Sequence, residues 1–494
     1  MNPLAWKQCA PRLATALATM AILLVTAGCG NGSPIIRSLG GGFTNASLNG
    51  QYVITETGIG VNQAGTASDP FSETIVFTAD GNRNLNITVD DFDQVGGPFI
   101  LPAPLTGTYS ISSDGIGSLS FNGSHYAITM IDDSHFYVIQ QDNFATASGF
   151  GEKQDITAFS AAPSGTFVFK AHNISSSSRV GGVTITGGAI SGTEDLLTLG
   201  LLSSSKPITG SFSATPPDSN GRSTFTLDDG SSFNYYVVSS GKFHFMSNST
   251  SGSLEIGQAE KQTGGPFSVA TLAAGTSYVF GSSGDTNFAA GIHSAGVFTS
   301  DGNGHITAGA VDFVQDATVN SNLLVSGGSY TLDATSGNGE IDLTVSVGTI
   351  KQKFWMVNGT RAYFLADSTA AVEDGTFSLQ QGAPFSALGS QAAFFMDGFD
   401  VTFKDRVGAF QPTSSGFKWN QAANAFNDTI GVGTLTNTAT NGTAQVGSNG
   451  RVTVTVNGVT NTNSLVFYLS SPGTGFMVQE DADIGGAFSQ QASQ

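Results

Sequence analysis

Charge and cysteine are both scarce in this chain of 494 residues. Only 11% of the residues are charged, and 37 Asp and Glu outnumber 18 Lys and Arg, which gives a formal net charge of −19. No run or stripe of basic residues interrupts this acidic balance. Such a surface repels a polyanion, so nucleic acid is excluded as a partner.

Catalytic signatures are missing as well. The sequence has no Gly-x-Ser-x-Gly elbow and no phosphate-binding loop. No close histidine pair of the kind that binds zinc occurs. We therefore assign no catalytic, cofactor-binding or metal-binding residue, and predict that the chain is not an enzyme and has no cofactor. The histidines are expected at the surface or half-buried: His125, His135, His172, His244, His293 and His305.

Glycine and phenylalanine, in contrast, are abundant, with 64 and 36 copies. Hydrophobic residues make up 39% of the chain, which is too many for a disordered linker. They alternate with polar residues in short runs that end in turn residues, as in Leu119 and Phe121 before Asn122-Gly123. This pattern predicts β-hairpins with a Phe-rich core, and no amphipathic helix beyond the leader. Trp355 and Trp419 are too few to indicate a sugar-binding platform.

One phrase, a glycine shortly before an aromatic strand, returns four times along the chain. Its copies begin at Gly50, Gly165, Gly275 and, in a weaker form, Gly389, so they are 115, 110 and 114 residues apart. This period is the size of a domain rather than of a solenoid repeat. Each copy ends on a Phe-Ser pair: Phe159-Ser160, Phe267-Ser268, Phe385-Ser386 and Phe488-Ser489.

These patterns predict an all-β protein with four tandem antiparallel β-meander domains. Eight strands joined by short hairpins can close into a small up-and-down barrel that resembles the calycins, and closure removes exposed strand edges. β-Sandwiches are the alternative fold. We expect separate domains, like beads along the chain, with a signal peptide at 1–28, a flexible tether at 29–47, and domains at 48–162, 163–272, 273–387 and 388–494.

The N-terminus has the form of an export signal, with Lys7 and Arg12 ahead of an apolar run. That run ends in Thr26-Ala27-Gly28-Cys29, which resembles the lipobox of bacterial lipoproteins, although the family usually has an aliphatic residue in place of Thr26. The resemblance implies that Cys29 becomes lipid-modified and N-terminal. The alternative is an ordinary secreted protein with a free Cys29 thiol. Because Cys9 belongs to the leader, the mature chain has no disulfide.

The resemblance also bears on location. Gly30 follows the cysteine, which by analogy with lipoprotein sorting does not favour retention in the inner membrane. We therefore expect a cell-envelope protein anchored by its lipid in the outer membrane or at the cell surface.

Three recurrent polar motifs are interpreted as structural. The turns at Asp80-Gly81-Asn82 and Asp301-Gly302-Asn303 lack the further acids of a calcium loop, so tight hairpins are the better interpretation. The endings Glu152-Lys153-Gln154 and Glu260-Lys261-Gln262 are typical of an exposed alternating strand. One Asp recurs in each unit and is expected to accept backbone hydrogen bonds at a strand end: Asp91, Asp195, Asp312 and Asp428.

The function predicted from these features is a non-enzymatic role in binding, adhesion or envelope structure, with repetition providing reach and multivalency. The membrane is a partner through the lipid, and the other candidate partners are a glycan, a surface or a small apolar ligand. Two alternatives stay open. The chain could be a carrier of small apolar ligands inside the barrels, which Phe- and Tyr-filled interiors would exclude, or a polysaccharide-acting enzyme with convergent acids in one unit.

Overall fold

The structure is a computed structural model that describes residues 42–492 with thirteen gaps. The gaps are 62–67, 95–96, 101–103, 174–176, 199, 249–253, 286–290, 316–317, 368–370, 400–401, 428–430, 459–464 and 481–482. Cys29 and Asp428, on which two of the expectations above depend, lie outside the described residues.

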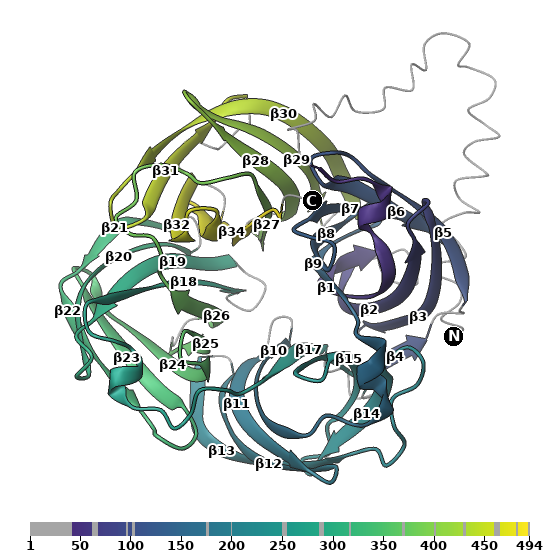
Figure 1. Cartoon of the computed structure of the whole chain (residues 1–494), viewed down its shortest axis with the longest axis horizontal. Coiled ribbons are helices and arrows are strands. Elements are labelled where there is room, and N and C mark those ends of the chain that lie inside the picture. Colours follow the sequence, from purple (N-terminus) through teal and green to yellow (C-terminus); the bar gives the residue numbers. More distant parts are fainter. Residues whose placement is uncertain are drawn as a thin grey trace.

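The described chain forms four β-barrels in sequence order, here called barrels 1 to 4 (Figure 1). Barrel 1 contains β1 (Asn49–Val61), β2 (Ser68–Asp80), β3 (Asn84–Gln94), β4 (Gly97–Ile100), β5 (Leu105–Ile111), β6 (Ile116–Phe121), β7 (Ser124–Met130), β8 (His135–Gln141) and β9 (Ala145–Lys153). Barrel 2 contains β10 (Gly165–Asn173), β11 (Ser177–Thr186), β12 (Ala189–Thr198), β13 (Leu201–Phe212), β14 (Arg222–Leu227), β15 (Ser232–Ser239), β16 (Lys242–Ser247) and β17 (Glu255–Lys261).

The second half of the chain repeats this plan. Barrel 3 contains β18 (Thr276–Asp285), β19 (Gly291–Ser300), β20 (His305–Gln315), β21 (Thr318–Val325), β22 (Gly327–Leu332), β23 (Asn338–Val345), β24 (Gly348–Asn358), β25 (Arg361–Ala366) and β26 (Val372–Leu379). Barrel 4 contains β27 (Ala392–Phe399), β28 (Phe403–Thr413), β29 (Gly416–Asn427), β30 (Val432–Val446), β31 (Arg451–Val456), β32 (Leu465–Ser471), β33 (Thr474–Gln479) and β34 (Ile484–Gln490).

Within each barrel eight strands pair antiparallel in sequence order, and the first strand pairs with the last. The extra strands β4 and β21 pair with β3 and β20, outside the closed circle of eight. The predicted up-and-down barrels are therefore confirmed, and the sandwich alternative is wrong. The described apolar residues around Gly200 belong to the end of β12 and the start of β13.

The barrel interiors are filled by aromatic and aliphatic side chains. In barrel 1, alternate residues of each strand point inward, and the Tyr52 and Phe77 rings stack at 5.6 Å between centroids. Barrel 2 contains seven inward Phe in its core and has an internal cavity of only about 40 Å³. Such a space holds about one water molecule. Interiors filled by Phe and Tyr side chains are the condition stated above for excluding a carrier that holds apolar ligands inside the barrels.

A Phe from the preceding linker closes one end of each barrel. Phe43 packs in the core of barrel 1, and Phe159, Phe267 and Phe385 pack in the cores of barrels 2, 3 and 4. Three of these linkers form short 3-10 helices: η1 (Asn45–Ser47), η2 (Ile156–Ser160) and η3 (Val269–Thr271). The Phe-Ser phrase that ends each sequence unit is thus the plug of the next barrel. Phe488 differs, because it lies on β34 within the core of barrel 4.

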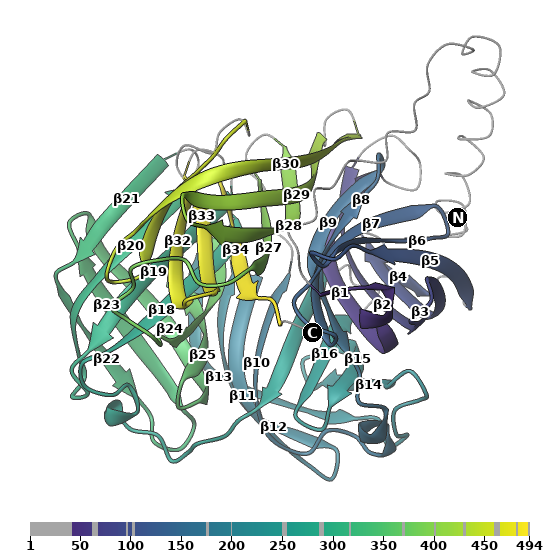
Figure 2. The ribbon, with the colours of Figure 1, turned by 45° about the horizontal axis from the view of Figure 1, so that its top comes forward.

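The four barrels pack side by side in a closed ring, and barrel 4 returns to contact barrel 1 (Figures 1 and 2). Each junction buries an apolar cluster from both partners. Val53 meets Tyr236 at the first junction, and Ala393 meets Ala127 at the ring-closing one. The four copies form separate closed barrels, as expected, but they do not lie like beads along a string, and repetition gives a compact ring rather than reach.

One glutamine fastens every junction in the same way. It follows the last strand of its barrel, and its side-chain amide donates to two backbone carbonyls of the next barrel at 2.6–3.0 Å. The residue after it donates its backbone N–H to the next barrel as well, at 2.6–2.9 Å. These glutamines are Gln154, Gln262, Gln380 and Gln491, with carbonyl partners on Asn220 and Val237, Ser336 and Met356, Asn449 and Leu469, and Asp114 and Met130.

The interpretation of the unit endings as exposed strand is thus wrong at several positions. Gln154 is buried across the first junction, and so is Glu152, which binds His244 Nε2 at 2.6 Å and Lys242 Nζ at 2.8 Å. Burial acts to raise the pKa of Glu152, but the charges of Lys242 and His244 lower it overall. Glu260 makes the corresponding contact with Arg361 at the second junction.

The recurrent Asp forms a second clamp at three of the four junctions. Asp91 accepts from Arg222 Nε at 2.6 Å and from Tyr236, and Asp195 accepts from Asn338 and Trp355 at 2.8 and 2.9 Å. Asp312 accepts from two nitrogens of Arg451 at 2.6–2.7 Å and from Tyr468. The role is structural, as expected, but the main partners lie in the next barrel.

The ring-closing junction lacks this acid clamp. In barrel 1, the clamp residue Asp91 lies in a row of cross-strand partners with Thr55 and Thr74. The equivalent row of barrel 4 is Phe395, Val407 and Ala422, so Ala422 occupies the position of the clamp Asp. The facing positions of barrel 1, Ile116 and Thr129, replace Arg451 and Tyr468. At this one position barrels 4 and 1 meet through apolar contacts, although elsewhere in the same junction Asn420 donates to the buried Asp114 at 3.0 Å.

We predict that Asp312→Ala destabilises the junction between barrels 3 and 4 by about 3–5 kcal/mol, because Arg451 keeps its charge in a buried place without its carboxylate. Denaturant midpoints measure the loss. The exposed Asp367→Ala of the same barrel is the matched control and should change little. The double variant Asp312→Ala/Arg451→Met should recover part of the stability, and full additivity of the two losses would contradict a direct pair.

A second prediction concerns ring closure. Gln491→Leu leaves the buried carbonyls of Asp114 and Met130 without their donor, which costs about 1–3 kcal/mol at this junction. We expect faster hydrogen exchange of the Ala492 amide, which donates to Ile131. The neighbouring Gln490 is exposed, so Gln490→Leu is the control. Equal exchange rates in both variants would refute the clamp.

Candidate functional site

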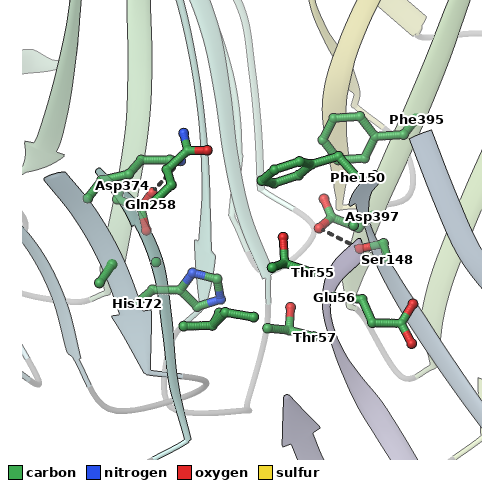
Figure 3. Close-up of a pocket in the computed structure, with 15 residues that line it drawn as sticks. Thr55, Glu56, Thr57, Ser148, Phe150, His172, Gln258, Asp374, Phe395 and Asp397 are labelled. Carbon is green, nitrogen blue, oxygen red and sulfur yellow. Dashed lines mark hydrogen bonds and ion pairs between the residues drawn. The ribbon is translucent and has the colours of Figure 1, made fainter. Parts of the chain in front are cut away.

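A polar pocket lies on the axis of the ring, where all four barrels meet. Two adjoining cavities of about 150 and 200 Å³ share six lining residues: Thr57, Ser148, Lys170, His172, Asp374 and Asp397. Asp397, Ser148, Phe150 and Phe395 face His172 and Gln258 across the pocket (Figure 3). The pocket is created by ring closure, since barrel 1 contributes one wall and barrel 4 the next.

Equivalent register positions in the four barrels line this axis with different chemistry. The cross-strand pair of the first two strands is Thr57 and Ser72 in barrel 1, and His172 and Ser178 in barrel 2. It is Ser283 and His293 in barrel 3, and Asp397 and Asp405 in barrel 4. Only barrel 4 has two carboxylates at these positions, so the pocket is asymmetric although the scaffold repeats.

One wall carries a neutralised acid. Asp374 of β26 accepts from Lys170 Nζ at 3.0 Å and from Ser178 Oγ at 3.1 Å, both from barrel 2. Burial acts to raise the pKa of Asp374, but the charges of Lys170 and His172 and the hydrogen bonds lower it overall. This carboxylate is therefore ionised at neutral pH, and its charge is offset within the protein.

The opposite wall carries an acid pair with hydroxyl partners only. Asp397 accepts from Ser148 Oγ at 3.1 Å, and Asp405 accepts from Thr146 Oγ1, both across the junction between barrels 4 and 1. Burial raises the pKa of Asp397. Burial also raises the pKa of Asp405 to about 7, and the charge of Asp397 adds to the effect while the Thr146 hydrogen bond opposes it. Near neutral pH Asp405 is thus poised between its neutral and its charged form.

His293 lies at the edge of the same pocket and is 2% exposed. Burial lowers its pKa to about 3, with a smaller opposite effect from the Asp483 backbone, so the ring is neutral at physiological pH. Neither ring nitrogen has a side-chain hydrogen-bond partner in the described part of the chain, and the Asp483 backbone lies close enough to the ring to influence its pKa. The expectation of surface or half-buried histidines is wrong here and at His244, which is 1% exposed.

Aromatic rings complete the wall beside the acid pair. Phe399 and Phe403 are cross-strand partners next to Asp397 and Asp405, and their rings stack at 4.3 Å between centroids. Both line the larger cavity. The pocket therefore offers charge and a flat apolar surface to the same ligand.

The motifs selected from the sequence lie away from this pocket. The two Asp-Gly-Asn turns are tight hairpins, in which Asp80 and Asp301 each accept two backbone N–H groups and Gly81 and Gly302 both have φ of +75°. Trp355 and Trp419 are 2% exposed and form part of a junction and of the barrel 4 core. Nothing in the sequence alone distinguished Asp374, Asp397 or Asp405 from other acids, because the barrels bring them together.

Metal and membrane sites were also considered. Within the described ranges, no group of three or more His, Cys, Asp or Glu is placed to hold a metal ion. Among those same residues no helix has both the length and the apolar character needed to cross a membrane.

Comparison with known proteins adds little. No protein-family model matches the chain, and no curated protein matches it in sequence. Among solved structures, a variant of the transferrin-binding protein B of Haemophilus parasuis Hp5 is 7% identical, with a TM-score of 0.20 over 67% of this chain and 76% of that one.

Two further structures resemble the chain as weakly. An intact transferrin-binding protein B with N and C lobes gives 7% identity and a TM-score of 0.18, over 67% of this chain and 76% of that one. The WD40 domain of SCAP from fission yeast gives 6% identity and a TM-score of 0.09, over 83% of this chain and 90% of that one. Likenesses of this size carry no functional argument.

The acid pair gives a prediction for stability against pH. The pKa of Asp405 is about 7 in the fold and about 3.9 in an unfolded chain, so the folded state binds more protons between these values. Its ionisation therefore removes stability as pH rises from about 4 to 7. Asp405→Asn should be more stable than the parent at pH 8, by on the order of 2–4 kcal/mol, and equal to it at pH 4.

Denaturant midpoints across this pH range measure the difference. The control is Asp367→Asn, which changes an exposed acid of barrel 3 and should follow the parent at every pH. An Asp405→Asn variant that is less stable than the parent at pH 8 would show that this carboxylate is not strained by burial.

Proposed function

We propose that the chain is an exported, lipid-anchored cell-envelope protein with a non-enzymatic binding role, and that its ligand enters the axial pocket. The observation that carries this proposal is the pocket itself, which uses one wall from each of four barrels and has different chemistry at equivalent positions. A purely structural ring would gain nothing from a buried acid pair at one of four equivalent sites.

The size of the pocket favours a small ligand. Sites for drug-sized ligands commonly occupy ~300–1,000 Å³. The two adjoining axial cavities are about 150 and 200 Å³, which together reach only the lower end of this range and suit a small ligand. The polysaccharide-acting enzyme is therefore the weaker alternative, and the filled barrels leave no room for the apolar carrier.

The anchor is proposed from the leader alone. The lipobox-like Thr26-Ala27-Gly28-Cys29 supports lipid modification of Cys29, and Phe43 is the first residue that packs into barrel 1. The intervening stretch, rich in Gly and Ser, would let the ring stand away from the outer membrane or cell surface. A secreted protein without lipid is the alternative.

The test of the anchor is Cys29→Ser in cells that express the full chain. We expect the parent to incorporate labelled palmitate and to fractionate with membranes, and the variant to lose both properties, because a single acyl chain or none does not hold a protein at a membrane. Mass spectrometry of the parent's mature N-terminus should show a diacylated or triacylated cysteine. An unmodified N-terminus near residue 29 would establish the secreted alternative instead.

A further inference from the structure

The axial pocket contains an electrostatic conflict that the protein itself does not resolve. Asp397 and Asp405 are directly opposite on neighbouring strands, where side chains on the same face have Cβ atoms about 4.5–5.5 Å apart. Like charges at this spacing destabilise a sheet. Barrels 1, 2 and 3 avoid the conflict, since they have hydroxyl or imidazole groups at the same positions.

Lys170 is the lysine that lines the described part of the pocket, and it already has an acidic partner. Its Nζ lies 3.0 Å from Asp374 on the other wall. The partners of the acid pair are the hydroxyls of Ser148 and Thr146, which donate hydrogen bonds but bring no charge. A bound cation would therefore complete the wall that barrels 4 and 1 form.

We propose that the axial pocket binds a small organic cation, an ammonium or guanidinium group on a short carbon stem, with its charge between Asp397 and Asp405. This inference rests on the binding role proposed above but not on the lipid anchor. It assigns each wall a part in recognising one ligand.

His293 supports the proposal independently of the acids. Its neutral ring lines the cavity, is 2% exposed and has no side-chain hydrogen-bond partner among the described residues. Burying a polar group without a partner is costly, so such a group usually has a bound water or ligand as its partner. A neutral imidazole nitrogen accepts a hydrogen bond from an N–H donor such as an ammonium or guanidinium group.

The stacked rings of Phe399 and Phe403 select an organic cation over a metal ion. On each strand the Phe lies two residues from the Asp, so the rings and the acid pair are on the same face of β27 and β28. Carbon atoms of a ligand gain by packing on this face, and a cation near it gains a further cation–π term. An anion would meet the charges of Asp374, Asp397 and Asp405 and is excluded.

The proposal implies that binding and proton release are linked. Asp405 is protonated in part of the free molecules near pH 7 and must ionise fully beside a bound cation. The charged or titratable groups that line the cavity with it are Asp397, Asp374, Asp285, Lys170, His172 and His293, from β27, β26, β18, β10 and β19. His293 stays neutral in the window from pH 6 to 8, and Asp374 stays ionised, so Asp405 and Asp397 determine the pH dependence.

The experiment is calorimetric titration of the mature ring with n-butylamine, 1,4-diaminobutane and n-butylguanidine, beside n-butanol and butyrate as uncharged and anionic probes. We expect a cationic probe to bind with a dissociation constant below about 1 mM at pH 8, and about tenfold more weakly at pH 6. Repeating the titration at pH 7 in buffers of different ionisation enthalpy should reveal protons released on binding. This second measurement needs no variant.

Two variants locate the site. Asp397→Asn and Asp405→Asn should each weaken binding at least about tenfold, and Asp405→Asn should also remove most of the pH dependence. The control Asp229→Asn changes an exposed acid of the turn between β14 and β15 that lines neither cavity, and it should bind as the parent does. Circular dichroism establishes that each variant is folded.

Several outcomes would overturn the inference. They are no binding of any cationic probe at about 10 mM to the folded ring, equal binding of butanol, binding that persists in both Asn variants, or tight binding of Ca²⁺ at the same site in place of amines. Failure here is distinguishable from failure of the proposed function. A lipidated chain whose pocket binds butyrate or another small molecule would refute the organic cation and keep the binding role.

Discussion

The architecture depends on one side-chain amide that fastens each barrel to its successor. The glutamine after each last strand gives its two N–H groups to two carbonyls of the next barrel, which would otherwise be buried without donors. Because the contact is the same at every junction, the rotation between neighbours is similar, and four such rotations complete a circle. The axial pocket follows from this closure, since no single barrel contains it.

Much of the fold could be predicted from the sequence, because strand alternation and Asp-Gly or Asn-Gly turns are local signals. The meander, the closed barrels and the structural turns at Asp80 and Asp301 all follow from such signals. The relation between barrels could not be predicted in this way. Phe159 and Gln154 look like ordinary ends of a unit, and only the three-dimensional contacts show that both belong to the next barrel's surface or core.

The site was missed for a related reason. The recurrent acids Asp91, Asp195 and Asp312 hold junctions between barrels. The sequence pattern predicts Asp428 as the fourth of them, whereas the strand register has Ala422 at the equivalent position. The acids of the pocket do not recur. Asp397 occupies the position of Thr57, His172 and Ser283, so the informative signal was the one place where the copies differ. In a repeated scaffold, shared residues build the frame and unique residues give it chemistry.

The unequal junctions have a consequence for the order of assembly. A chain that is synthesised from its N-terminus completes barrel 1 first, and each later barrel can dock on a predecessor through a glutamine and a buried Asp. The outer face of barrel 1 at Ile116 and Ala127 then stays wet until barrel 4 covers it. An arc of three barrels therefore exposes this apolar surface beside Asp114, which later accepts from Asn420 of barrel 4, and folding chaperones could bind it before the ring closes.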